Sequence, residues 1–164
     1  MEISSSLLAA QLNFTKWASH KLLTYALTVP EEDLTRHLGN SHGSILNTFQ
    51  HIYYGDRIWF SRLNNTPRPG SDFADPEPGP SLADLDRDWW PLLKDFEAVA
   101  KATDPSGVMH YKTLKGDPME RPNWQTILHI VNHGSYHRGQ IAAMLRQQGH
   151  LPPGTDLIYY YLQM

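Results

Sequence analysis

The chain has 164 residues, enough for one compact domain with a buried core and too few for two ordinary domains. Hydrophobic residues make up 40% of the chain and charged residues 19%, which is typical of a globular protein. A formal net charge of −3 leaves no basic surplus to neutralise phosphates, so we expect no nucleic-acid partner. We therefore expect one domain, residues 1–164.

The sequence also limits the cellular setting and the available chemistry. No apolar run approaches the roughly 20 residues that span a bilayer, and the first residues lack a secretory-signal pattern. We expect a cytoplasmic protein that does not act at a membrane. Cysteine is absent, which excludes disulfides, thiolate metal ligands and a cysteine nucleophile. Any thiol chemistry must use a thiol supplied from outside.

Three segments in the first two thirds of the chain carry apolar residues at helical spacing. The first runs from about Ser6 to Leu27. The second begins after Ser44, a plausible N-cap, and ends near Asn64 and Asn65. The third follows Ser81, which is predicted to form a capping box with Asp84. Each is long enough to bury one face against the others.

The remaining segments differ in character. Thr66 to Pro80 carries five prolines and two glycines, which favours a long crossover loop. Met109 to Leu114 and Met119 to Asn123 flank a turn-like centre, which indicates a short hairpin or an irregular excursion. A fourth helix is predicted from Asn123, as its N-cap, to Gln148, before Gly149. Four long helices with one crossover loop predict an all-α helix bundle.

Three of the nine histidines lie on one face of the fourth predicted helix. His129, His133 and His137 are spaced by four, so they fall within a stripe roughly 80° wide. Two imidazoles at this spacing can bind one cation, although the histidines of an isolated pair are more often surface or core residues held by hydrogen bonds. A firm site for a divalent ion needs a further donor from another part of the chain.

The spacing of residues does not identify that further donor. On the second predicted helix, His51 lies away from the apolar stripe, whereas Asp56 lies within it, an expensive place for an unpaired charge. Both features suggest a helix that is contacted on more than one side. The histidine candidates outside the fourth helix are His20, His37, His42, His51 and His110.

Four segments, in order along nearly the whole chain, resemble the DinB/YfiT-like metalloenzyme family. The strongest are HIVNHGSYHRGQIAAMLRQQG and HIYYGDRIWFSRL, and weaker ones are NFTKWASHKLL and LPPGTDLIYYY. The resemblance implies a four-helix bundle in up-down-down-up order, with the Pro-rich crossover between helices two and three. It also implies that one metal ion is bound by His51, His133 and His137, and that the protein is a homodimer.

The resemblance leaves other residues near the implied ligands with supporting roles. His129 does not match a ligand position, and we expect it to support the ligands instead of binding the ion. Arg138 and Gln140 can orient ligands or simply pack helices. Gly134 and Gly139 are expected to allow close approach of a neighbouring helix. Asp56 can hold a ligand ring or pair with an arginine, and we favour a structural role.

Three imidazoles leave a divalent ion an open position, as in catalytic zinc sites. Zinc or nickel is the expected metal, and a small molecule the expected substrate. The resemblance favours an enzyme that uses an external low-molecular-weight thiol, of S-transferase or isomerase type. The alternatives are a metal-dependent hydrolase and a non-enzymatic, metal-stabilised stress-response binding module. The aromatic segment Tyr159 to Tyr161 can serve a dimer interface or pack in the core.

Overall fold

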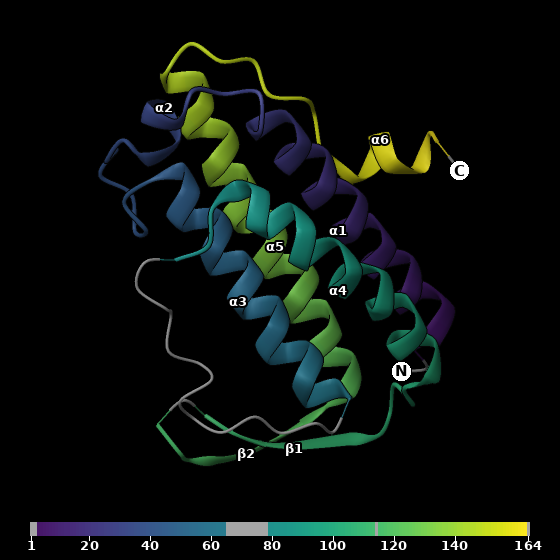
Figure 1. The fold of residues 1–164 in the computed structure, drawn as a ribbon. Coiled ribbons are helices and arrows are strands. Elements are labelled where there is room, and N and C mark those ends of the chain that lie inside the picture. Colours follow the sequence, from purple (N-terminus) through teal and green to yellow (C-terminus); the bar gives the residue numbers. More distant parts are fainter. Residues whose placement is uncertain (1–2, 65–78, 114, 164) are drawn as a thin grey trace.

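The computed structural model describes residues 3–64, 79–113 and 115–163. In these ranges the fold is mostly helical, with one two-stranded antiparallel sheet (Figure 1), so the prediction of a mainly helical protein is confirmed. The long helices are α1 (Ser5–Ala26), α3 (Ile45–Leu63), α4 (Leu82–Ala102) and α5 (Asn123–Gln147). Two five-residue helices, α2 (Glu31–Thr35) and α6 (Leu157–Tyr161), were not predicted. All but the end of the predicted crossover loop, Thr66 to Pro80, lies outside the described residues.

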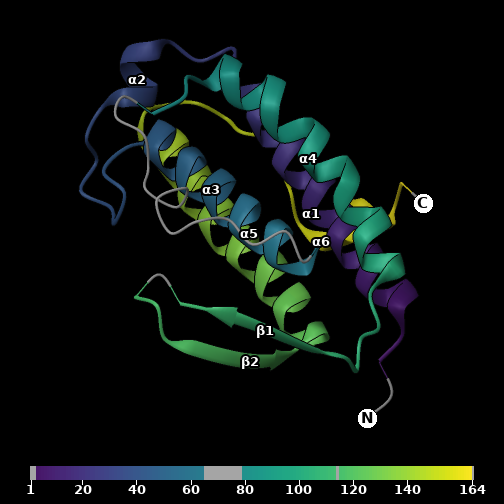
Figure 2. The same cartoon turned by 60° about the horizontal axis from the view of Figure 1, so that its bottom comes forward.

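The long helices share one apolar core. α1 packs against α4 and α5, and α3 packs against α5 and α4. Both views show α3 beside α5 and α1 beside α4 (Figures 1 and 2). The largest fully buried apolar side chains come from all four long helices and are Leu8, Leu22, Ile45, Phe49, Ile52, Leu85, Trp89, Phe96, Ile127, Ile130 and Ile141. The contact between α3 and α5 is the one that brings the predicted metal ligands together.

The starts of α3 and α5 test the N-caps that the sequence predicted. Ser44 caps α3, because its Oγ accepts a hydrogen bond from the backbone N–H of Asn47 at 3.1 Å. The predicted cap of α5 is wrong by one residue: Pro122 occupies the N-cap position and Asn123 is the first helical residue. The side chain of Asn123 instead donates to the backbone oxygen of Asp104 at 2.9 Å. It therefore ties α5 to the segment that follows α4.

The segment before α5 forms a hairpin, which decides between the two predicted possibilities. β1 (Val108–Lys112) pairs with β2 (Pro118–Pro122), and His110 lies opposite Glu120. The hairpin contacts α3 through β1 and α5 through β2. Figure 2 shows it crossing the end of this helix pair. It thus covers one end of the layer that carries the predicted site.

Among the described helices, none combines the length and the apolar character that crossing a membrane requires.

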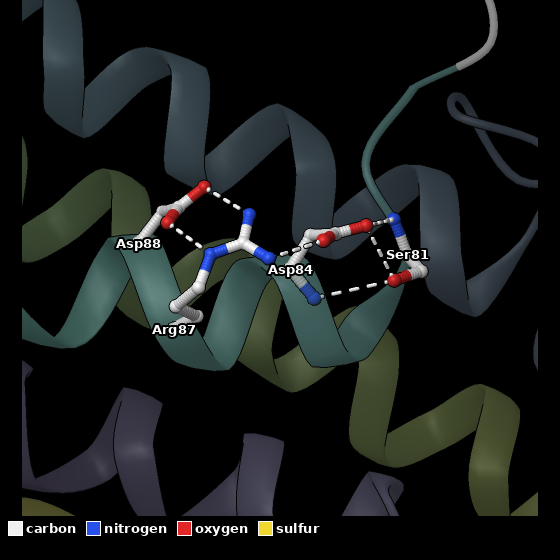
Figure 3. A network of polar contacts seen from close by, with 4 residues as sticks. All are labelled: Ser81, Asp84, Arg87 and Asp88. Atoms are coloured by element: carbon white, nitrogen blue, oxygen red, sulfur yellow. Dashed lines mark hydrogen bonds and ion pairs between the residues drawn. The ribbon is translucent and has the colours of Figure 1, made fainter.

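The start of α4 carries the predicted capping box (Figure 3). Ser81 Oγ accepts from the backbone N–H of Asp84 at 3.2 Å, and Asp84 Oδ2 accepts from the backbone N–H of Ser81 at 3.1 Å. Arg87 extends the network, donating to Asp84 at 2.8 Å and to Asp88 at 2.7 Å. Two otherwise unpaired donors at the helix start are thereby satisfied.

Replacing Ser81 with alanine is expected to lower the free energy of unfolding by about 1 kcal/mol, because the cap bond is lost. Ser4 is the matched control, since it occupies the N-cap position of α1 without a side-chain cap bond. Chemical denaturation of the parent, Ser81→Ala and Ser4→Ala proteins checks this. Equal losses in the two variants would show that the capping box adds nothing.

Candidate metal centre

Four imidazoles meet between α3, α5 and the loop that precedes α3. The Nε2 atoms of His51 and His133 are 3.0 Å apart. The ring of His137 lies 4.5 Å, centroid to centroid, from the rings of both His51 and His133. The structure therefore brings the three predicted ligands together, joined by His42 from the loop. Whether they bind a metal stays a prediction.

The two helices position these rings in different ways. His133 and His137 are one turn apart on α5, so their side chains leave the same face. His51 comes from α3, which packs against α5. A Cβ on Gly55, one turn after His51, would lie 3.0 Å from Cε1 of His133. The absent side chain at Gly55 thus lets the His133 ring lie against α3.

The donor arrangement fits a divalent cation. Nitrogens that bind one tetrahedral zinc ion at about 2.0–2.1 Å lie about 3.3 Å from each other. The 3.0 Å separation between Nε2 of His51 and Nε2 of His133 is close to this value. Neutral imidazoles suit zinc and nickel among the common metals. The donor type of the cluster and the spacing of this pair are therefore those of a metal site.

Burial keeps two of these rings in the form that can bind a metal. Desolvation, reinforced by the neighbouring His42 and His137, lowers the pKa of His51 to about 4. Desolvation also lowers the pKa of His133 to about 3, and the surrounding histidines add to this effect. Near neutral pH both rings are uncharged, so a proton does not compete for their lone pairs.

A hydrogen bond to the amide oxygen of Gln140 orients the buried ring of His137. The Nδ1 atom of His137 lies 2.8 Å from Oε1 of Gln140. An amide oxygen can only accept, so the proton resides on Nδ1, and Nε2 keeps its lone pair. Metal-binding histidines commonly have such a partner on the other ring nitrogen. This contact fits an orienting role for Gln140, one of the two roles that the sequence left open.

His42 is the cluster member that the sequence did not single out. Its ring stacks on that of His51, with centroids 3.9 Å apart and planes inclined by 22°. One donor atom from each of His42, His51 and His137 lies within 4.8 Å of the others. His42 was one of several candidate donors, but no helical periodicity marks a residue in a loop. Only its proximity to the Ser44 cap was visible in the sequence.

His129 lies beside the cluster. Its ring centroid is 5.7 Å from that of His133 and 5.1 Å from Trp59, which it meets edge to face. Its side chain is exposed, in contrast to that of His137. This geometry fits a side chain that packs against a ligand, as predicted, and leaves His129 a good control residue.

Asp56 lies fully in the core, as its place in the apolar stripe of α3 suggested. Its Oδ2 accepts a hydrogen bond from the indole N–H of Trp89 at 2.9 Å. Burial raises the pKa of Asp56 to about 7, opposed by this hydrogen bond and by the charge of Arg138. Arg138 is also buried and donates to Ser19 at 3.1 Å and to Ser135 at 3.0 Å. These contacts involve all four long helices, which supports the structural role preferred for Asp56.

The two glycines of α5 differ in their surroundings. A Cβ on Gly134 would lie 2.7 Å from Nη1 of Arg138 and 3.5 Å from Thr15 on α1, so this glycine does allow close packing. The same expectation for Gly139 is wrong, because nothing would lie within 4 Å of a Cβ there. Gly139 is instead exposed on the surface of α5.

Replacing Gly55 with alanine is expected to weaken zinc binding several-fold, because the new Cβ pushes on the His133 ring. Gly139→Ala is the matched control: it adds the same methyl group on α5 into open space. We expect unchanged zinc affinity there and a helix stabilised by roughly 0.5–1 kcal/mol. Competition titrations with a zinc-binding dye measure both affinities. Parent-like affinity in Gly55→Ala would show that the position of the His133 ring is not critical.

The fold and this histidine cluster define a helical protein with a candidate metal centre. The DinB family profile matches residues 4–163, and the chain belongs to that family. It is also similar to Protein DinB of Bacillus subtilis (strain 168), with 21% identity over 153 residues. The match covers 90% of this chain and 89% of that protein, so the similarity extends over nearly the whole of both chains.

Proposed function

We propose that this protein binds one divalent metal ion, zinc or nickel, through His51, His133 and His137, and uses it with an external low-molecular-weight thiol. The reaction would be of S-transferase or isomerase type on a small-molecule electrophile. One observation carries the proposal: three imidazoles from α3 and α5 converge, with Nε2 of His51 3.0 Å from Nε2 of His133. Membership of the DinB family supports it.

A divalent ion held by neutral imidazoles keeps its full charge and supplies Lewis acidity, which lowers the pKa of a bound thiol or water. The chain supplies the holding and orienting groups. Gln140 fixes the proton of His137 on Nδ1, and burial keeps His51 and His133 uncharged. Because the chain has no cysteine, the reacting sulfur must come from a second molecule.

The proposal includes the arrangement of the helices. We infer one domain in which α1, α3, α4 and α5 form a four-helix bundle in up-down-down-up order. The helix contacts support it, as does the course of the chain in Figure 1, where α1 and α5 run opposite to α3 and α4. This order places His51 on a helix antiparallel to the one that carries His133 and His137.

We further propose a homodimer. Its support is the exposed apolar surface at the C-terminal end, where Ile158 is 59% and Leu162 76% accessible. In the aromatic segment Tyr159 to Tyr161, the side chain of Tyr160 instead packs against Trp17, with ring centroids 5.7 Å apart. The cytoplasmic location stays an expectation.

The experiment that tests the function uses zinc-loaded and nickel-loaded protein with glutathione or cysteine and the electrophile 1-chloro-2,4-dinitrobenzene. The result we expect is metal-dependent formation of the thioether, lost in His133→Ala and kept in His110→Ala, whose ring is exposed on the hairpin. Hydrolysis of p-nitrophenyl acetate without any thiol would favour the hydrolase. Metal binding and stabilisation without turnover of either substrate would favour a binding module.

A further inference from the structure

His42 lies on the loop between α2 and α3, residues 36–44, and not on a helix. Hydrogen bonds nevertheless fix this loop. The backbone N–H of Leu38 donates to the oxygen of Gly43 at 2.7 Å, and that of Gly43 donates to Asn40 at 3.1 Å. The side chain of Asn40 reaches α5, where it contacts the sulfur of Met144 at 3.0 Å. The fold therefore holds His42 in a defined place.

Gly43 helps to direct the His42 side chain. Its φ of 81° lies in the left-handed region, which residues with a Cβ adopt at a cost. The chain thereby turns between His42 and Ser44, which caps α3. The turn leaves the ring of His42 half buried and stacked on His51, with centroids 3.9 Å apart. The centroid of the His42 ring also lies 5.1 Å from that of His137.

We propose that His42 is a fourth protein ligand of the metal ion, so that four imidazoles from three separate segments surround it. This inference rests on the proposed metal site and adds a donor that neither helix supplies. Donor atoms of His42, His51 and His137 all lie within 4.8 Å of one another. Donors around tetrahedral zinc are separated by about 3.3 Å, so these three rings would have to move closer together to bind one ion.

A fourth imidazole changes what the site can do. Four protein ligands close the coordination of a tetrahedral ion, whereas three leave one position for a water or a substrate. Access of a thiol to the ion would then require either release of His42 or a fifth coordination position, and His42→Ala would leave one position open.

The test is the absorption spectrum of the cobalt-loaded His42→Cys protein. The parent has no cysteine, so any thiolate-to-cobalt charge-transfer band in the near ultraviolet must come from the introduced thiolate. We expect this band in His42→Cys, and no such band in His37→Cys, a control from the same loop. Zinc titrations should add a rise of at least about 10-fold in the dissociation constant of His42→Ala, compared with parent-like binding by His37→Ala.

The outcomes separate this inference from the proposed function. Cobalt bound by His42→Cys without the band, together with parent-like zinc affinity in His42→Ala, would overturn His42 as a ligand. The three-histidine site would then stand if His133→Ala still loses metal. Failure of the parent itself to bind cobalt or zinc would overturn both. Thermal unfolding of the metal-free variants confirms that each one is folded before it is loaded.

Discussion

His51→Ala is expected to raise the dissociation constant for zinc by at least about 100-fold, the upper end of what loss of a ligand's supporting partner costs. The substitution removes the only donor that α3 contributes to the cluster. His133 and His137 would remain on one face of α5, with only the proposed loop ligand His42 beside them and no donor from α3, so the enclosure of a divalent ion is weakened. Competition with a chromophoric chelator at neutral pH measures the change.

His129→Ala is the control for this loss, because it removes an imidazole from the same face of α5. Its ring lies 5.7 Å from that of His133 and packs on Trp59, so we expect near-parent affinity. Firm binding by His51→Ala combined with metal loss in His129→Ala would show that the ligands are wrongly assigned.

Asp56→Ala is expected to lower the free energy of unfolding by about 2–3 kcal/mol, as the loss of a buried hydrogen-bond partner does. The truncation leaves the indole N–H of Trp89 without its acceptor and the buried Arg138 without a nearby negative charge. Asp88→Ala, on the exposed side of α4, is the control and should cost no more than about 1 kcal/mol. Urea denaturation measures both.

Asp56→Asn separates the charge from the hydrogen bond. The amide oxygen still accepts from Trp89, so we expect a smaller loss than in Asp56→Ala. The folded-state pKa of Asp56, about 7, is raised above the unfolded value of 3.8, so its ionisation disfavours folding. The stability advantage of the parent over Asp56→Asn should therefore shrink as pH rises from about 4 to 7. An advantage that grows over this range would contradict the raised pKa.

The parts of the structure that follow from short-range patterns could be predicted. Apolar periodicity located the four long helices, with both ends of α1, α3 and α5 within a residue or two, and the Ser44 and Ser81 caps fall where their side-chain chemistry requires. The hairpin was one of two possibilities, since its strands have only five residues each. α2 and α6 are equally short, and five residues carry too little periodicity to mark a helix.

The parts that depend on contacts between distant segments could not be predicted from spacing alone. A helical wheel placed His51 away from the apolar stripe of α3, yet its ring is half buried because α3 is contacted by α2, α4, α5 and β1. The partner of Asp56 is Trp89 on another helix, which no local pattern reveals. His42 joins the cluster only through the fold of its loop. The family resemblance, and not the spacing, selected His51 from five candidates.

The central claim is that this cluster holds one metal ion, and elemental analysis of the purified, untagged protein tests it most directly. The protein is supplied with zinc or nickel, dialysed, and compared with His133→Ala treated in the same way. We expect roughly one ion per chain in the parent and far less in the variant. A parent that retains no metal after either supply would contradict the claim and make the histidine cluster a packing feature of α3 and α5.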